Sequence, residues 1–389
     1  MAILEEMRAR QAEMVEWRRD IHAHPELGFE EQRTADLVAR KLESFGCAVA
    51  RGVGRTGVVG TLRSGNSPHA IGLRADMDAL PIQEANLFDY RSRHDGRMHA
   101  CGHDGHTSSL LGAARYLCET RDFDGTVHFI FQPAEEGIGG ARAMIADGLF
   151  ERFPCEQVFG YHNAPGLPVG RFGVRPGPMM AGGAFFDIVV QGKGAHGARP
   201  ESSVDPVLAA CHITAALQSI VSRNVKPSET VVLSVTRVDG GDAYNVIPDR
   251  ATIRGTARAY STETMALIEA AMRRVAAGVA AGFGATVEVD FRLIFAPLVN
   301  DAGAATFMAD VAAELVGEAQ VDRDRAPVMG SEDFSFMLQA VPGAYMHVGN
   351  GVERGGCPIH NPNYDYNDDA LPYAAALYAR LVERRLAPA

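Results

Sequence analysis

The first 160 residues alternate between short apolar runs and amphipathic stretches. The apolar runs are 57–63, 69–75, 126–131 and 156–161, and the amphipathic stretches are 107–120 and 139–147. Runs of this length are typical of β-strands, whereas the longer stretches have the period of helices. The alternation predicts an α/β fold in which a mostly parallel sheet is covered by helices on both faces. The chemistry of such a fold lies beyond the carboxyl ends of its strands.

A second pattern begins near residue 180, after a cluster of prolines and glycines that breaks regular structure. Strands are expected at 184–191, 230–238, 251–259 and 285–292, with helices at 205–222 and 262–282. This order predicts an α+β sandwich. The earlier alternation resumes after Pro297. We therefore expect a discontinuous catalytic domain, 1–180 and 293–389, with a second domain, 181–292, inserted into it.

Composition excludes several classes of protein. The chain has 37 basic and 48 acidic residues, a net charge of −11, so no nucleic-acid partner is expected. No apolar run approaches the roughly 18 residues that span a bilayer, so no membrane partner is expected. The densely charged N-terminus lacks a signal-peptide core, and we expect a cytoplasmic protein. The six cysteines form no C-x-x-C pair, which argues against a zinc ribbon or a disulfide framework.

Carboxylates follow two of the expected strands. Asp76 and Asp78 end an apolar run, and residues two apart share one face of a strand. Glu135 and Glu136 follow the next such run. Adjacent carboxylates point in different directions, so one can bind a metal while the other takes a proton from water. This division of labour is the one a metallohydrolase needs.

The segment 99–106 gathers thiol, imidazole and carboxylate groups before a helix: His99, Cys101, His103, Asp104 and His106. Thiolate and imidazole together are the ligands that a zinc-like metal prefers. Period-2 spacing would align His99, Cys101 and His103, so spacing alone does not choose among these three residues. The rival chemistry is a Cys–His nucleophile, which needs Cys101 activated by a histidine and leaves the carboxylates without a role.

Two further histidines stand at comparable positions. His162 ends the apolar run 156–161, and His360 lies in a loop rich in glycine and proline. Cys357, three residues before His360, could be mistaken for a metal ligand. A single histidine at either position is more often a structural or surface residue than a metal ligand. Together with the aspartate, cysteine and glutamate candidates they exceed what one tetrahedral metal requires, so two metals are expected.

Nine motifs along the chain are recognisable. They are RRDIHAHPELGFEE (18–31), GLRADMDALP (72–81), HACGHDGHT (99–107), FQPAEEG (131–137), YHNAPGLPVG (161–170), GKGAHGARPE (192–201), NVIPDRATIRGTAR (245–258), MGSEDFSF (329–336) and CPIHNPNYDYN (357–367). In this order they resemble the amidohydrolases of the hippurate hydrolase and indole-3-acetyl-amino-acid hydrolase type. These belong to the aminoacylase/carboxypeptidase family of two-metal exopeptidases.

The resemblance implies a site with two divalent metals. By matching motif positions, the ligands would be Cys101, which bridges both metals, His103, Glu136, His162 and His360. Glu135 would be the general base that takes a proton from the attacking water and passes it to the leaving amine. Asp78 would orient a ligand. Roles for Asp76, His99 and His106 stay open.

The resemblance also implies that the inserted domain is a lid that dimerises the protein as a homodimer or homotetramer. Its motif would present His196 to the active site, of the same subunit or of its partner, to stabilise the oxyanion of the tetrahedral intermediate. Asn245 would bind the substrate carboxylate or the oxyanion. From the residues alone, His196 reads as a surface residue of a tight turn between glycines.

The implied function is metal-dependent hydrolysis of the amide bond of an N-acyl amino acid, giving a carboxylate and a free amino acid. The ligand types suit Zn or Mn, with Co or Ni also possible. Alternatives with the same site are a deacetylase of the N-acetyl-diaminopimelate type and a dipeptidase. A non-catalytic metabolite sensor is a further alternative.

Residues in two of the motifs are assigned to helix ends and not to the chemistry of the site. His22 and His24, which precede Pro25, are assigned to capping a helix end. Ser331 is expected to cap a helix that begins within 330–336.

Overall fold

The structure of the protein, a computed structural model, describes residues 2–388. It divides into two compact units. The first contains the described residues up to Met179, Val299–Ala326 and the residues from Asp333 onward. The second contains Met180–Leu298 and Pro327–Glu332, so it extends past residue 292, where we expected the inserted domain to end.

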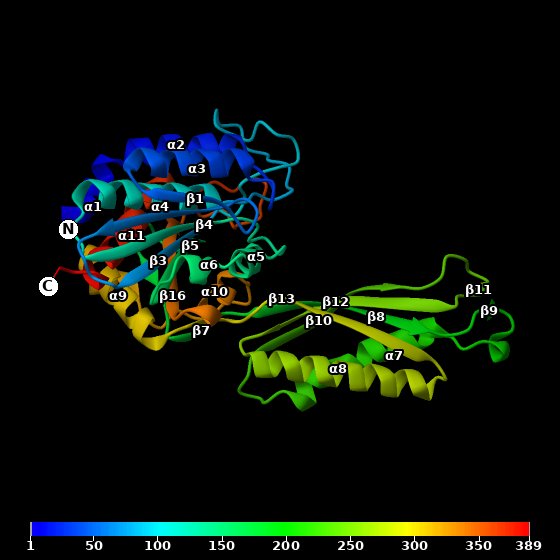
Figure 1. Ribbon diagram of the computed structural model, residues 1–389. Helices are drawn as coiled ribbons and strands as arrows, with labels where there is room; N and C mark the ends of the chain where they lie inside the picture. Colours follow the sequence, from blue (N-terminus) through cyan, green and yellow to red (C-terminus); the bar gives the residue numbers. More distant parts are fainter. Residues whose placement is uncertain (1, 389) are drawn as a thin grey trace. The chain divides into compact units, whose positions relative to one another are not determined.

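The first unit is built on an eight-stranded sheet (Figure 1). Its strands, in spatial order, are β1 (Ala48–Val53), β2 (Gly57–Ser64), β4 (Gly125–Gln132), β3 (Ala70–Asp76), β5 (Gln157–Pro165), β16 (Gly343–Gly351), β6 (Phe172–Gly173) and β15 (Val321–Asp322). The central strands β4, β3, β5 and β16 are parallel to their neighbours in this group, whereas β1, β2 and β6 introduce antiparallel pairs. The predicted α/β fold with a mixed, mostly parallel sheet is confirmed.

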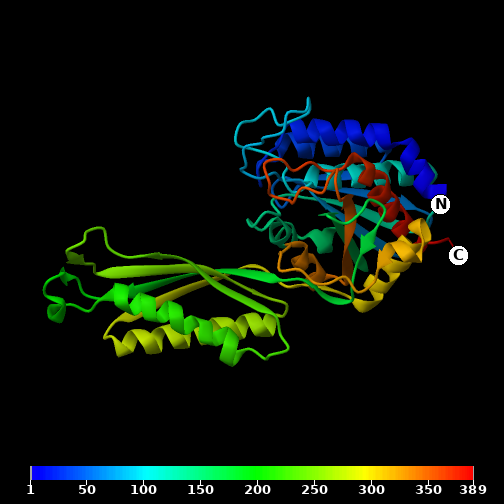
Figure 2. The ribbon, with the colours of Figure 1, turned by 180° about the vertical axis from the view of Figure 1, so that it is seen from behind.

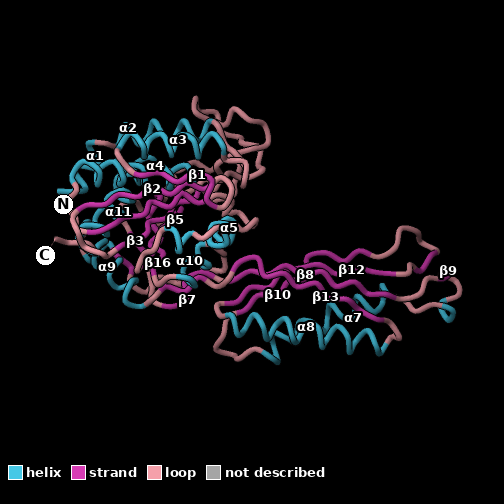
Figure 3. Tube along the Cα trace, viewed as in Figure 1, coloured by secondary structure: helices cyan, strands magenta, loops and turns pink. Residues whose placement is uncertain are grey.

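Helices cover this sheet on both faces (Figures 1 and 3). They are α1 (Ala2–Ala9), α2 (Gln11–Ala23), α3 (Gln32–Phe45), α4 (His103–Thr120), α5 (Gly140–Ala146), α6 (Leu149–Arg152), α9 (Ala302–Val316), α10 (Phe334–Ala340) and α11 (Leu371–Arg385). Figure 2 shows the same unit from behind, with α9 and α11 near the C-terminus. All seven residues of β3 are buried, as expected for a strand that packs against helices on both faces.

Two expected helices differ in their bounds. The helix expected at 107–120 begins at His103, because Gly102 adopts a left-handed conformation (φ 92°) and starts the helix there. Glycine takes this conformation without steric cost. The expected helix cap at Ser331 is wrong: α10 starts at Phe334, and the Ser331 hydroxyl instead accepts a hydrogen bond from Arg258.

The second unit is an α+β sandwich. Its antiparallel sheet has the order β10 (Val231–Asp239), β12 (Arg250–Ala259), β8 (Gly182–Gln191) and β13 (Thr286–Phe295), and it packs against α7 (Pro206–Ser219) and α8 (Thr262–Gly282). A short ribbon pairs β9 (Ala195–His196) with β11 (Val246–Ile247). A separate two-stranded sheet joins β7 (Gly177–Met180) and β14 (Leu298–Asn300).

Candidate metal centre

The candidate ligands come from the edge of the sheet where three neighbouring parallel strands end. Asp76 is the last residue of β3, Glu135 and Glu136 follow β4, and His162 lies in β5. Since β3 pairs with both β4 and β5 in parallel, the carboxyl ends of these strands meet. The turn into α4 adds Cys101 to this edge.

The structure brings the five expected ligands together in two overlapping groups. In one, ligand atoms of Cys101, His103 and His162 lie within 4.8 Å of one another, and in the other the same holds for Cys101, Glu136 and His360. The Cys101 sulfur is 3.3 Å from Nε2 of His162, and Nε2 of His360 is 3.3 Å from Oε1 of Glu136. A sulfur common to both groups is the geometry that a bridging thiolate requires.

Two histidines are held so that Nε2 faces the centre. His103 Nδ1 donates to the Asp78 carbonyl oxygen at 2.8 Å and lies 3.2 Å from its carboxylate. His162 Nδ1 donates to the Asn163 carbonyl oxygen at 2.8 Å. A proton on Nδ1 leaves the lone pair on Nε2, the arrangement that outer groups impose on metal-binding histidines.

Two buried atoms that lack a hydrogen-bond partner among the described residues fit a bound cation. Nε2 of His103 and Oε1 of Glu136 are buried and accept no hydrogen bond from the residues that the structure describes. Unsatisfied buried polar atoms are costly, and two of them face the same centre. Sulfur, imidazole and carboxylate donors together suit a divalent transition metal.

The electrostatics of Cys101 favour a metal ligand over a nucleophile. Burial and the nearby carboxylates Glu136 and Glu135 raise the pKa of the Cys101 thiol well above its usual value. Burial and the neighbouring His106 lower the pKa of His162 well below its usual value, so His162 is neutral. A thiolate–imidazolium pair, which the Cys–His nucleophile requires, is therefore disfavoured. A divalent cation at the centre would stabilise the thiolate.

Glu135 lies beside the ligands without belonging to the two groups that share Cys101. Glu135 is buried, and its carboxylate lies within 4.8 Å of ligand atoms of His103 and Glu136. It accepts a hydrogen bond from the Asp333 backbone N–H at 3.3 Å. Asp78 is also buried, and its second oxygen accepts the Glu136 backbone N–H at 3.0 Å. Asp78 thus contacts the segments that carry two candidate ligands, His103 and Glu136.

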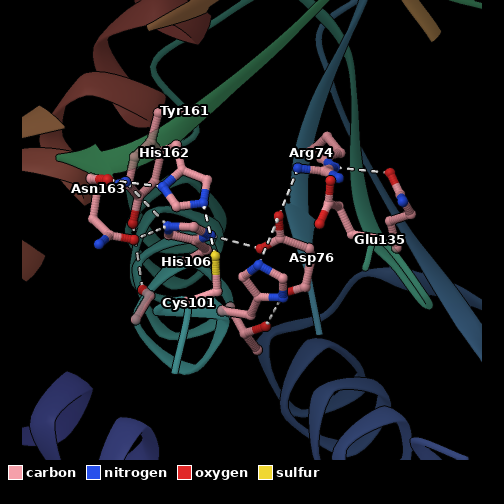
Figure 4. A network of polar contacts seen from close by, with 12 residues as sticks. Arg74, Asp76, Cys101, His106, Glu135, Tyr161, His162 and Asn163 are labelled. Atoms are coloured by element: carbon pink, nitrogen blue, oxygen red, sulfur yellow. Dashed lines mark hydrogen bonds and ion pairs between the residues drawn. The ribbon is translucent and has the colours of Figure 1, made fainter. Parts of the chain in front are cut away.

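Asp76 and His106 form a polar network next to the centre (Figure 4). Asp76 accepts hydrogen bonds from Arg74 at 2.7 Å and from His106 Nδ1 at 2.6 Å, and His106 Nε2 lies 2.7 Å from the Asn163 side-chain oxygen. Burial by itself raises the pKa of Asp76, but the neighbouring His103 imidazole, the Arg74 guanidinium and the hydrogen bond from His106 hold that pKa well below its usual value. Both ring nitrogens of His106 are engaged, so it is a supporting residue.

Sequence reasoning missed Arg74 and Asn163, which complete this network. The only signal for Arg74 was an arginine inside an otherwise apolar strand, where a buried cation needs an acidic partner. Asn163 lies directly after His162 and carried no distinguishing pattern.

The capping role assigned to His22 is wrong, whereas His24 does end α2. His22 is buried, with Nδ1 2.8 Å from Asp104 and Nε2 3.1 Å from Glu84. Burial by itself lowers the pKa of His22, and the hydrogen bonds to Asp104 and Glu84 more than offset it, raising the pKa to about 9. His99 is buried as well, and burial lowers its pKa to about 4.

His196 and Asn245 lie in the second unit, and they are neighbours there. His196 pairs with Val246 in the β9–β11 ribbon, and the Gly197 N–H donates to the Asn245 carbonyl oxygen at 2.7 Å. His196 and Asn245 are both exposed. His196 Nδ1 accepts the Ala198 N–H at 3.0 Å, so a neutral ring carries its proton on Nε2.

Known proteins match most of this chain. The model of peptidase family M20/M25/M40 matches residues 72–384. The chain belongs to this family. It is 44% identical over 386 residues to hippurate hydrolase from Campylobacter jejuni, covering 99% of this chain and 100% of that protein. It is 42% identical over 381 residues to IAA-amino acid hydrolase ILR1-like 4 from Arabidopsis thaliana, covering 96% and 86%.

A solved structure agrees. The chain superimposes with a TM-score of 0.85 and 36% identity on the Bacillus subtilis YXEP protein, described as a dinuclear metal binding peptidase of the M20 family, covering 97% of this chain and 99% of that one. This member of the M20 family is therefore an amidohydrolase, and its fold is one that holds metal. Among residues 2–388, no helix is both long and apolar enough to cross a membrane.

Proposed function

We propose that this M20-family enzyme hydrolyses the amide bond of N-acyl amino acids, releasing a carboxylate and a free amino acid. Its ligands would be Cys101, His103, Glu136, His162 and His360, holding two divalent cations. The observation that carries the proposal is the Cys101 sulfur, which belongs to both ligand groups. The cations would supply Lewis acidity that polarises the scissile carbonyl and lowers the pKa of water. The donor types favour Zn or Mn.

Glu135 is the residue we assign to proton transfer. The buried carboxylate of Glu135 forms a cluster with His103 and Glu136. The reacting carbonyl would lie next to this cluster. There Glu135 would accept the proton of the attacking water and return it to the leaving amine nitrogen. Asp78 keeps His103 in the orientation that this geometry needs.

His196 and Asn245 are assigned to the anionic intermediate and to the carboxylate of the substrate. The support is the free Nε2–H of His196, which is exposed beside Asn245 on the same ribbon. A donor of this kind stabilises an oxyanion when substrate brings it within hydrogen-bond distance. Mixing inactive His196→Ala and Glu135→Gln subunits tests whether His196 acts in cis or in trans, because activity returns only in trans.

Exposed apolar residues that neighbour the ligands in sequence favour an apolar acyl group. Ile138 follows Glu136 by two residues and is 55% exposed, and Ile359 directly precedes His360 and is 38% exposed. The Ala85 N–H also bonds to the Pro362 carbonyl oxygen, which brings the loop of exposed Leu87 to the segment of His360. Benzoyl or indolyl groups would bury such surface more effectively than a second carboxylate.

We also propose that the second unit acts as a lid and dimerises the protein. The support is its sheet, in which β10 and β13 are edge strands and β13 spans ten residues with alternate side chains exposed. An edge of this length is suited to pairing with a second copy. Sedimentation of the loaded enzyme would show a dimer or tetramer, and scattering with and without product carboxylate would report closure. The six free cysteines suit a reducing compartment, so we place the reaction in the cytoplasm.

The test is turnover on a small panel by stripped protein reloaded with Zn, Mn, Co or Ni. The panel contains N-benzoyl-Gly, an indole-3-acetyl amino acid, N-acetyl-Met, N-acetyl-diaminopimelate and Gly-Leu. Metal-dependent hydrolysis, fastest on the benzoyl or indolyl substrate, is expected. Fastest hydrolysis of N-acetyl-diaminopimelate or Gly-Leu would mean that the enzyme is a deacetylase of that type or a dipeptidase. No hydrolysis of any substrate, despite about two bound metals, would favour a metabolite sensor.

A further inference from the structure

Two cysteines far apart in sequence meet inside the first unit. The sulfur atoms of Cys47 and Cys118 are 3.4 Å apart, although the residues are separated by 71 positions. Cys47 follows Gly46 at the end of α3, and Cys118 lies in the last turn of α4. Both belong to the main apolar core and are buried, at 8% and 9% exposed. Neither takes part in the metal centre.

The backbone on both sides of the pair is fixed. The Cys47 N–H donates to the Leu42 carbonyl oxygen at 3.0 Å, and the Arg121 N–H donates to the Leu117 carbonyl oxygen at 3.0 Å. A disulfide needs a sulfur separation of about 2.05 Å, so the atoms must approach by a little over 1 Å. Rotation of the two side chains about their Cα–Cβ bonds is the movement that this approach requires.

Cys118 lines a pocket at the surface of the first unit. This pocket of about 360 Å³ is bounded by Cys118 together with Lys41 and Arg115, and Cys47 is not part of its lining. The hydrogen bond with Cys47 lowers the pKa of the Cys118 thiol, and Arg121 lowers it further. The same hydrogen bond raises the pKa of Cys47. A peroxide entering the pocket therefore meets Cys118 before Cys47.

We propose that Cys47 and Cys118 are a peroxide-sensitive thiol pair that forms a reversible disulfide between α3 and α4. The Cys118 thiolate attacks one peroxide oxygen, the O–O bond breaks, and Cys118 sulfenic acid and hydroxide form. The Cys47 thiol then attacks the sulfenic sulfur, the S–S bond forms, and water leaves. The balance is two thiols and one hydrogen peroxide converted to one disulfide and two waters. A thiol reductant reverses the change.

The disulfide would stabilise the fold without disturbing the metal centre. His103 begins α4, and fifteen residues separate it from Cys118, which corresponds to about 22 Å along a helix. The bond links segments 71 residues apart, which restricts the unfolded chain. We expect turnover to stay within about twofold and the midpoint of thermal unfolding to rise by at least about 2 °C.

The experiment uses the metal-loaded, full-length protein, treated with hydrogen peroxide, alkylated and digested for mass spectrometry. A cross-linked peptide containing Cys47 and Cys118, 2 Da lighter than the two thiol peptides together, is expected, and a reductant should remove it. In Cys47→Ser, Cys118 should be trapped as a sulfenic acid by dimedone, whereas in Cys118→Ser, Cys47 should stay unmodified. Cys155→Ser, which removes a different cysteine, should leave the cross-link unchanged.

Three results would overturn the proposal. One is wild-type protein without the cross-link at a peroxide dose that modifies other cysteines. Another is equal dimedone labelling of Cys47 and Cys118 in the two single variants. The third is a cross-linked protein whose unfolding midpoint is unchanged.

Discussion

Nδ1 of His103 lies 2.8 Å from the carbonyl oxygen of Asp78 and 3.2 Å from its carboxylate. Because both acceptors belong to one residue, the proton stays on Nδ1 and the Nε2 lone pair faces the other candidate ligands. Asp78 also accepts the Glu136 backbone N–H, so one buried carboxylate supports ligands from two loops.

Replacing Asp78 should therefore weaken metal binding. We expect Asp78→Asn to lower the affinity for the metals about 10- to 100-fold, because the amide no longer holds the charge that supports His103. Competition with a chelator measures the change. Asp36→Asn, on the exposed face of α3, is the matched control and should leave the affinity unaltered. Equal affinities for wild type and Asp78→Asn would remove Asp78 from the centre.

Substitutions of Glu135 and Glu136 should affect different properties, turnover in the first case and metal binding in the second. Glu135→Gln should retain both metals but lose about 10²- to 10⁴-fold in kcat, since the amide cannot accept a proton. Glu136→Gln should lose metal, because its carboxylate lies 3.3 Å from His360 Nε2 in one ligand group. Elemental analysis and turnover are measured on the same samples. Loss of metal from Glu135→Gln would make Glu135 a ligand and leave the base unassigned.

His22 should make stability depend on pH. Its folded pKa of about 9 lies above its ordinary value, so the stabilisation is fully present below about pH 6.5 and is lost as pH rises through 9. His22→Gln removes the cation beside Glu84, whereas Asp104 keeps Arg18 at 2.9 Å, and the loss of the charged imidazole should cost about 3 kcal/mol at pH 6. Urea unfolding of both proteins from pH 6 to 9 should show this difference shrinking.

The control for His22→Gln is the same substitution at His24. His24→Gln, at the half-buried end of α2, should cost no more than about 1 kcal/mol at pH 6. A His22→Gln difference that stays constant from pH 6 to 9 would mean that His22 is neutral in the folded protein.

The start of α4 should not tolerate a side chain at Gly102. Gly102 has φ 92°, and a Cβ there would lie 2.4 Å from the Asn163 side-chain oxygen and 2.6 Å from the Tyr364 hydroxyl. Gly102→Ala should destabilise the protein by more than about 2 kcal/mol and reduce metal content, because Cys101 and His103 flank it. Gly96→Ala shares the left-handed conformation (φ 73°) but has open space around it, so it should cost about 1 kcal/mol. Equal losses for the two variants would contradict a specific role for the turn.

The sequence could predict the fold wherever the pattern was local. The apolar runs and amphipathic stretches place β2, β3, β4 and β5 to within a few residues, because period and length depend only on neighbouring positions. The start of α4 was misplaced by four residues, since Gly102 lies where Asn163 and Tyr364, distant in sequence, leave no space for a side chain. His22 was misjudged for a similar reason: its acidic partners, Asp104 and Glu84, are more than sixty residues away.

The sequence by itself determined the fold class, the family motifs and the types of donor available near residues 76, 101, 135, 162 and 360. It did not decide which histidine nitrogens are free, because that depends on the partner each ring meets in the folded chain. His103 and His106 are three residues apart, yet Nε2 of His103 has no hydrogen-bond partner within residues 2–388, whereas both nitrogens of His106 are engaged. The tertiary structure made that choice by placing Asp78 beside one ring and Asp76 with Asn163 beside the other.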